Sequence, residues 1–168
     1  VHKIYRRSVP GLPASAYDDL SAFKIYLADV GLLRRLAMLA PTAFGEGNRL
    51  FTEFKGALTE NYVLQTLVTQ FEVIPRYWSK SNPPYEVDFL IQRENDIFPV
   101  EVKSETNTIS KSLKKFKELY SDKVKLRIRF SLDNLKLDGD VLNIPLFMAD
   151  YSNQLIGIAL DNQKNTPA

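Results

Sequence analysis

The sequence has no cysteine and a single histidine, His2, in 168 residues. Without cysteine the chain can form neither a disulfide nor a cysteine-based zinc site, a composition compatible with a reducing cytoplasm. His2 lies at a terminus, where chains fray, so it is a poor candidate for a metal ligand or a general base. Sites that depend on histidine, such as a Ser-His-Asp triad or an HExxH metal motif, are therefore disfavoured.

Long apolar runs and an excess of one charge are also missing. No stretch approaches the roughly 18 apolar residues of a membrane span, and no basic start leads into an apolar signal segment. We therefore expect a soluble, cytoplasmic chain with no membrane partner. The 22 basic and 20 acidic residues give a net charge of only +2, which points to no class of partner. A hydrophobic content of 45% and a length of 168 residues suit one domain of ordinary size.

Residues 85–103, YEVDFLIQRENDIFPVEVK, combine two strand patterns around a polar turn. Apolar residues alternate or cluster at 85–91 and 97–103, which favours a strand in each segment. The five residues between them are all polar, which favours a turn. We therefore expect the two strands to pair as an antiparallel hairpin.

Side-chain alternation would place the charged residues of this hairpin on one face. Glu86 and Asp88 share a face of the first strand, and Glu101 and Lys103 share a face of the second. The opposite, buried face is expected to carry Val87, Phe89, Ile91, Val100 and Val102. Pairing would gather three carboxylates and one ammonium, and carboxylates are the ligands that Mg²⁺ prefers. Such a metal would polarise a phosphate beside the lysine.

The acid-x-Lys pattern is weak evidence by itself, because 20 acidic residues and 13 lysines give about 1.5 matches by chance. Two occur, at 53–55 and at 101–103. The second is distinguished by its apolar strand, which follows another strand that carries Asp88. The alternative is a hairpin with one solvated, charged face, which is common in antiparallel sheets.

Residues 50–71 form the longest helical pattern, and a strand is expected at 73–78. The apolar stripe of the helix includes Tyr62, Val63, Leu67 and Phe71. Glu60 lies near the edge of this stripe, where it either faces the hairpin or is an exposed residue with good helix propensity. In the strand, Tyr77 and Trp78 either stack on a nucleobase or are buried.

A basic region follows the hairpin. Ser110 is a suitable cap for a helix that extends through Tyr120, and a strand of alternating basic and apolar residues is expected at 123–130. The polar side of the helix carries Lys111, Lys114, Lys115 and Lys117. Residues 103–129 contain nine basic and three acidic residues. This excess would attract a phosphate backbone, or it belongs to an ordinary solvated surface.

The two ends of the chain show shorter patterns. Residues 1–49 are expected to form a connector with a strand near 23–27 and a helix capped by Asp29, closed by a loop at 41–48. A strand is expected at 144–148 and a short apolar element at 156–160. Residues 161–168 are polar and are expected to be loose.

The predicted order of elements, helix, three strands, helix and strand, resembles the core of the PD-(D/E)XK nuclease superfamily. Glu60, Asp88, Glu101 and Lys103 match in order the helix acid, strand Asp and Glu-x-Lys of that family. The resemblance implies an α/β fold with a mixed sheet flanked by helices over residues 50–160. It also implies that Asp88 and Glu101 bind Mg²⁺ or Mn²⁺ and that Lys103 activates the attacking water. Glu60 would orient a water molecule at the metal or bind a second ion.

Several segments resemble a conserved domain of unknown function that follows the ATPase module in a family of prokaryotic AAA-type ATPases. The segments are FKIYLADVGLL, KGALTENYV, EVDFLI, PVEVKS and SLKKF, within residues 23–148. None of the seven glycines forms a G-x-x-x-x-G-K-[ST] loop, so no ATP site is expected. The resemblance implies a C-terminal fragment, whose first 22 residues end a winged-helix segment and whose partner is the ATPase module.

Two classes of function are compatible with these residues. The first is a Mg²⁺-dependent DNA endonuclease or resolvase-like domain that an ATPase delivers or gates. The second is a binding module for nucleic acid or protein that has the same site but little turnover. The complete set of acids and the lysine favour the first class.

Overall fold

A computed structural model describes residues 1–40, 42, 49–105 and 110–165. The loop expected at 41–48 lies almost wholly outside these residues. The strands are β1 His2–Arg7, β2 Asp18–Tyr26, β3 Arg76–Ser81, β4 Pro84–Arg93, β5 Asp96–Val102, β6 Arg127–Ser131, β7 Lys136–Asp138 and β8 Val141–Pro145. The helices are α1 Val30–Leu36, α2 Arg49–Gln70, α3 Lys111–Leu119 and α4 Ser152–Asn165, with short 3₁₀ segments at Ala14–Tyr17 and Leu146–Tyr151.

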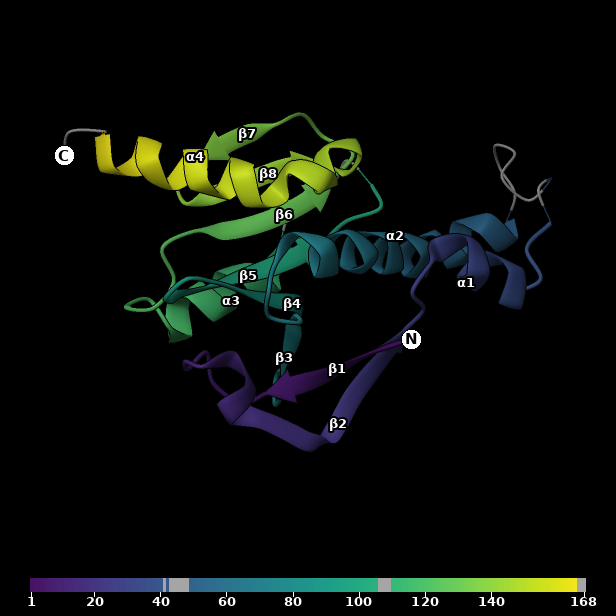
Figure 1. The fold of residues 1–168 in the computed structure, drawn as a ribbon, viewed down its shortest axis with the longest axis horizontal. Coiled ribbons are helices and arrows are strands. Elements are labelled where there is room, and N and C mark those ends of the chain that lie inside the picture. The colour runs from purple at the N-terminus through teal and green to yellow at the C-terminus, as the bar shows by residue number, and fades with distance from the viewer. Residues whose placement is uncertain (41, 43–48, 106–109, 166–168) are drawn as a thin grey trace.

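One mixed sheet organises the fold, with the strand order β2-β1-β3-β4-β5-β6-β8-β7 (Figure 1). Strands β3, β4 and β5 form an antiparallel meander, whereas β5, β6 and β8 run parallel. This arrangement confirms the expected α/β fold, a mixed sheet flanked by helices. The segment expected as a connector contributes two strands to the same sheet, because β1 pairs with β2 and also with β3.

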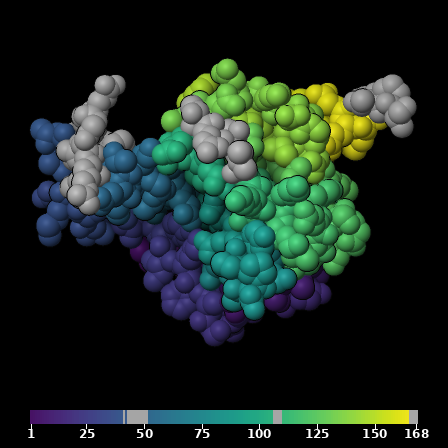
Figure 2. All heavy atoms as spheres, turned by 180° about the vertical axis from the view of Figure 1, so that it is seen from behind, coloured from purple at the N-terminus to yellow at the C-terminus, as the bar shows by residue number. Residues whose placement is uncertain are grey.

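Helices cover both faces of the sheet. Val63 and Leu67 of α2 and Ile156 of α4 pack in the larger core against one face. Leu113 and Phe116 of α3 pack in a smaller core against the other face. Figure 2, seen from behind, shows α3 and the turn that follows it covering this second face. Ser110 caps α3 by accepting from the Leu113 N–H at 3.1 Å, as its sequence position predicts.

The antiparallel pairing of β4 and β5 confirms the expected hairpin, with Phe89 opposite Val100. The expected single buried face is wrong. Trp78 of β3 pairs with Val87 and Arg76 pairs with Leu90, so β4 carries one extra residue between these pairs. This bulge turns Val87 toward the α3 core, whereas Phe89 faces the α2 core.

The aromatic pair of β3 is buried. Tyr77 is 7% exposed and Trp78 is 2% exposed. Trp78 packs edge-on against Phe116 of α3, with ring centroids 5.2 Å apart. Neither ring is available to stack on a nucleobase, so the interpretation of both residues as buried is confirmed.

Three expected boundaries differ from the structure. β2 begins at Asp18 rather than near residue 23, and β3 begins at Arg76 rather than residue 73. β6 begins at Arg127 rather than residue 123, because the preceding segment first turns around the end of α3. In that turn the Val124 N–H donates to the Tyr120 carbonyl at 3.1 Å, and Val124 itself is buried.

The C-terminal segment also differs from expectation. The strand expected at 144–148 is β8, which ends at Pro145 and gives way to a 3₁₀ segment. The segment expected as a short apolar element and a loose tail is α4, which continues to Asn165. Ile156 and Ala159, three residues apart on α4, are buried against the sheet, and their contacts stabilise a helix whose other residues are mostly polar. Among the described residues, no helix has the length and hydrophobicity needed to cross a membrane.

Candidate functional site

Asp88 lies where the β4–β5 ladder ends. The last paired residues on this side are Phe89 and Val100, and beyond them the Val102 N–H donates to the Asp88 carboxylate at 2.8 Å instead of to a backbone carbonyl. At the bulge in β4, the Val102 N–H therefore bonds to a side chain and not to the backbone of the neighbouring strand. The Asp88 carboxylate lies between the ends of the two strands.

Glu101 and Lys103 occupy the neighbouring strand end. Glu101 is only 6% exposed, and its two oxygens contact the Lys103 ammonium and the Ser110 hydroxyl. Ser110 thus has two roles, since it caps α3 and also donates to Glu101. This bond ties the start of α3 to the site.

Glu60 of α2 approaches the site from the other side of the sheet. The Tyr26 hydroxyl donates to Glu60, and the Lys24 ammonium lies 3.4 Å from the same Glu60 oxygen. Lys24 also contacts Glu86 of β4. Both Lys24 and Tyr26 belong to β2, so an edge strand of the sheet supplies the partners of Glu60.

Hydrogen bonds fix the end of β2 to α2. Asn61, the residue after Glu60, accepts from the Leu27 N–H at 2.9 Å and donates to the Leu27 carbonyl at 3.1 Å. Gln65, one turn later, accepts from the Val30 N–H at 2.9 Å. These bonds hold Lys24 and Tyr26 against the helix at the level of Glu60.

Two hollows meet at Asp88. The narrow hollow, of about 290 Å³, is lined by Gly56, Glu60, Asp88, Val102, Lys103, Ser104 and Glu105. The wide hollow, of about 530 Å³, shares Asp88, Val102 and Lys103 with it and adds Glu86, Glu101 and Ser112 among others. The four residues that the sequence matched to a nuclease site, Glu60, Asp88, Glu101 and Lys103, therefore line one connected surface.

The pKa of Asp88 is raised to about 7, mainly because the carboxylate is shielded from water. The charges of Glu60 and Glu101 raise it further, whereas the Val102 N–H and the charge of Lys24 lower it. Burial would lower the pKa of Lys24, but Glu60 and Glu86 raise it above its ordinary value, so Lys24 is charged. Burial and Glu60 raise the pKa of Tyr26, which therefore remains a hydrogen-bond donor.

The donor set suits a divalent cation bound by two carboxylates. Among the described residues, no three Asp, Glu or His side chains are already gathered as a complete set of metal ligands. Mg²⁺ commonly uses one or two carboxylates and keeps several waters, so Asp88 and Glu101 are sufficient. A cation bound beside Asp88 would favour its ionised form, against the burial and the neighbouring acids that raise its pKa.

Of the four lysines expected to form a basic surface on α3, only two are available to a partner. Lys117 contacts the Val124 carbonyl and lies 4.0 Å from Asp140, so it holds the following turn to the helix. Lys115 pairs with Glu118 at 3.2 Å. Lys111 and Lys114 are exposed and have no ion-pair partner within the part of the chain that the structure describes. These two remain the best candidates for contacts with phosphate.

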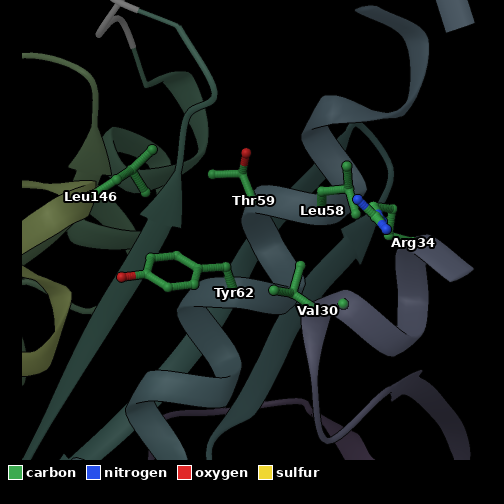
Figure 3. A pocket seen from close by; sticks show the side chains of 7 residues that line it. Val30, Arg34, Leu58, Thr59, Tyr62 and Leu146 are labelled. Carbon is green, nitrogen blue, oxygen red and sulfur yellow. The ribbon is translucent and has the colours of Figure 1, made fainter. Parts of the chain in front are cut away.

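A separate, apolar pocket of about 370 Å³ lies between α1, α2 and the start of the second 3₁₀ segment. Figure 3 shows Thr59 and Tyr62 of α2 between Leu146 on one side and α1 on the other. Its remaining lining residues are Val30, Gly31, Arg34 and Leu58. No acid lines this pocket among the residues that the structure describes.

Sequence patterns did not identify Lys24, Tyr26 and Ser110 as parts of the site. Strand alternation places Lys24 and Tyr26 on one face of β2, but their contacts with Glu60 span 36 and 34 residues. Ser110 was recognised only as a helix cap. No local signal reveals such long-range partners.

Replacing Asp88 with Asn should change how stability depends on pH. Between about pH 4 and pH 7 the unfolded chain ionises Asp88 while the folded chain keeps it protonated, so stability falls as pH rises through this window. Asn still accepts from Val102 but does not ionise. One pKa unit corresponds to about 1.4 kcal/mol. From pH 5 to pH 8 the free energy of unfolding of the wild type should therefore fall by at least about 1.4 kcal/mol more than that of Asp88→Asn.

Urea denaturation at both pH values, with a chelator present, measures this difference. Asp122→Asn, at an exposed aspartate, is the control and should follow the wild type. Parallel curves for wild type and Asp88→Asn would show that Asp88 ionises normally.

Comparison with known proteins gives one family. No curated protein and no solved structure matches the chain. A family model described as a domain of unknown function, DUF4143, matches residues 55–147. This match covers more than half of the chain, including Glu60, Asp88, Glu101 and Lys103, but not Lys24 or Tyr26 of β2. The chain therefore belongs to the DUF4143 family.

Proposed function

We propose that this chain is a PD-(D/E)XK-type nuclease domain that hydrolyses phosphodiester bonds in DNA with Mg²⁺ or Mn²⁺. The observation that carries the proposal is the convergence of Asp88, Glu101 and Lys103 at the open end of the β4–β5 ladder, beside Glu60. Three segments of the chain supply these residues, and they meet on one hollow surface. A solvated strand face would not require a buried Glu101 or a shielded Asp88.

Each residue has a distinct role in this proposal. Asp88 and Glu101 hold the cation, which polarises the scissile phosphate and lowers the pKa of water. Lys103 contacts Glu101 and faces both hollows, so its ammonium can hold a phosphate oxygen and the attacking water. Ser110 fixes the second oxygen of Glu101 and thereby orients this carboxylate.

The substrate path follows from the position of α3. Ser112 of α3 lines the wide hollow together with Asp88 and Glu101. The exposed Lys111 and Lys114 belong to the same short helix. A DNA backbone that contacts these lysines would therefore pass beside the acids. The resemblance to the domain that follows the ATPase module of AAA-type ATPases supports such a module, in the same full-length chain, as the partner, with the cytoplasm as the place of action.

Asp88→Ala and Lys103→Ala should each reduce cleavage of supercoiled or branched DNA by at least about 100-fold, because the first removes a ligand of the cation and the second removes the ammonium that holds the phosphate and the water. DNA affinity should change by less than about threefold, since phosphate contacts on α3 are retained. A gel assay with Mg²⁺ or Mn²⁺ measures cleavage, and fluorescence anisotropy measures binding. Asp122→Ala, at an exposed acid, is the matched control and should cleave normally.

The assay is run on this chain and on a longer chain that carries an ATPase module, with and without ATP. Binding without metal-dependent cleavage under all these conditions would contradict the nuclease. The domain would then be a binding module that regulates its ATPase.

Lys111→Glu combined with Lys114→Glu should weaken DNA binding at least about tenfold near 0.1 M salt. The slope of log affinity against log salt should also fall by about 2, because two phosphate contacts are lost. Lys136→Glu with Lys164→Glu changes the same charge at exposed lysines of β7 and α4 and should have a much smaller effect. Equal losses in both pairs would show that only net charge matters. A wild-type chain that binds no nucleic acid would favour a protein partner.

A further inference from the structure

We propose that Lys24 takes the place of a second metal ion, so that the site works with one divalent cation. This inference rests on the metal site of the proposed function and goes beyond it. The helix acid of the site, Glu60, has two possible roles, orienting water or binding a second ion. The contacts of Lys24 decide between them.

Lys24 already occupies the position of a cation at Glu60. Its ammonium lies 3.4 Å from the Glu60 oxygen, contacts Glu86, and lies 5.1 Å from the centre of the Tyr77 ring. The side chain is 26% exposed, so these contacts are only partly screened by water. A carboxylate on each side and an aromatic face hold the ammonium.

The position of Lys24 is fixed by the fold. Its strand, β2, pairs with β1 through Lys24 opposite Ile4, and Ile4 is fully buried. The strand end is bonded to α2 through Asn61. Tyr26, two residues along the same face, donates to the same Glu60 oxygen. This oxygen therefore has a cation and a hydroxyl donor before any metal arrives.

Charge balance gives the number of ions. Four acids interact around the site, and we call Glu60, Glu86, Asp88 and Glu101 the acid cluster. Lys24 and Lys103 are the ammonium groups in contact with them. Among these six groups, four ionised acids and two ammonium groups leave an excess of two negative charges, which one divalent cation neutralises. The positive charge of Arg129, which acts on Glu101, leaves still less need for a second ion. A second divalent cation would have to displace Lys24 or lie beside its like charge.

The two lysines divide the acid cluster. Lys103 pairs with Glu101 on one side of Asp88, and Lys24 pairs with Glu60 and Glu86 on the other. Asp88 is the acid for which no ion pair with a described residue is present. The wide hollow is lined by Asp88 and Glu101 but not by Glu60, so the single cation is placed there, where it would replace Lys103 or Ser110 at one Glu101 oxygen. Glu60 is left to position Lys24 and any water near it.

The number of Mn²⁺ ions bound at saturation tests this inference without any activity measurement. Titration followed by the EPR signal of free Mn²⁺ should give one ion for the wild type. Lys24→Met removes the charge and keeps much of the apolar stem, so Glu60 and Glu86 become available and a second ion should bind. Lys24→Arg keeps the charge and should bind one ion. Lys80→Met, at an exposed lysine of the wide hollow, is the matched control and should also bind one.

The outcomes separate this inference from the proposed function. A wild type that binds no Mn²⁺ would overturn the metal site itself. A wild type that binds two ions, or a folded Lys24→Met that binds one, would overturn the role of Lys24 and leave the metal site intact. If Lys24→Met does not fold, Glu60→Gln gives the same test. It should still bind one ion at the Asp88–Glu101 position, whereas loss of an ion from a two-ion wild type would show that Glu60 is a metal ligand.

Discussion

A shortage of positive charge at the open end of the β4–β5 ladder is the constraint on which the site depends. Four carboxylates are brought together, and two ammonium groups accompany them. Burying a charged group without a partner is costly, so each acid must be paired, bonded or protonated. Glu60 and Glu101 are paired, Glu86 contacts Lys24, and Asp88 has a raised pKa. Asp88 is therefore the acid whose ionised form a bound cation would stabilise most.

The sheet makes this arrangement possible. In a regular β4–β5 ladder the Val102 N–H would donate to a backbone carbonyl of β4. Because of the bulge in β4, this N–H donates to Asp88 instead. The β1–β2 ribbon extends the same sheet and carries Lys24 to Glu60. Because the family match begins at residue 55, part of the site lies outside the matched segment. A truncated domain that begins there would have Glu60 without its cation.

The sequence predicted the parts of the fold that local patterns determine. Periodicity located α2 and the β4–β5 hairpin, and cap chemistry located the starts of α1 and α3. It also placed Asp88 and Glu101 on adjacent strands. Alternation failed at Val87, because a bulge shifts the faces and leaves no mark in the sequence. Helix α4 was missed, because its few buried residues are explained only by tertiary packing.

The partners of the acids could not be predicted for a related reason. Lys24 is about 36 residues from Glu60 and 62 from Glu86 along the chain. The strand order of the sheet and the bonds between α2 and the end of β2 bring it to them. Lys117 is a second example. It lies on the polar side of α3 and was expected to be available to solvent or phosphate, but its ammonium donates to the Val124 carbonyl in the following turn. Long-range contacts decide both cases.

Anomalous scattering from a crystal soaked in Mn²⁺ would show directly where the cation binds. We expect one strong peak between Asp88 and Glu101, with carboxylate oxygens at about 2.0–2.6 Å, and no peak at Glu60 while Lys24 is in place. No peak near Asp88 at saturating Mn²⁺, or a peak only on surface acids elsewhere, would contradict it.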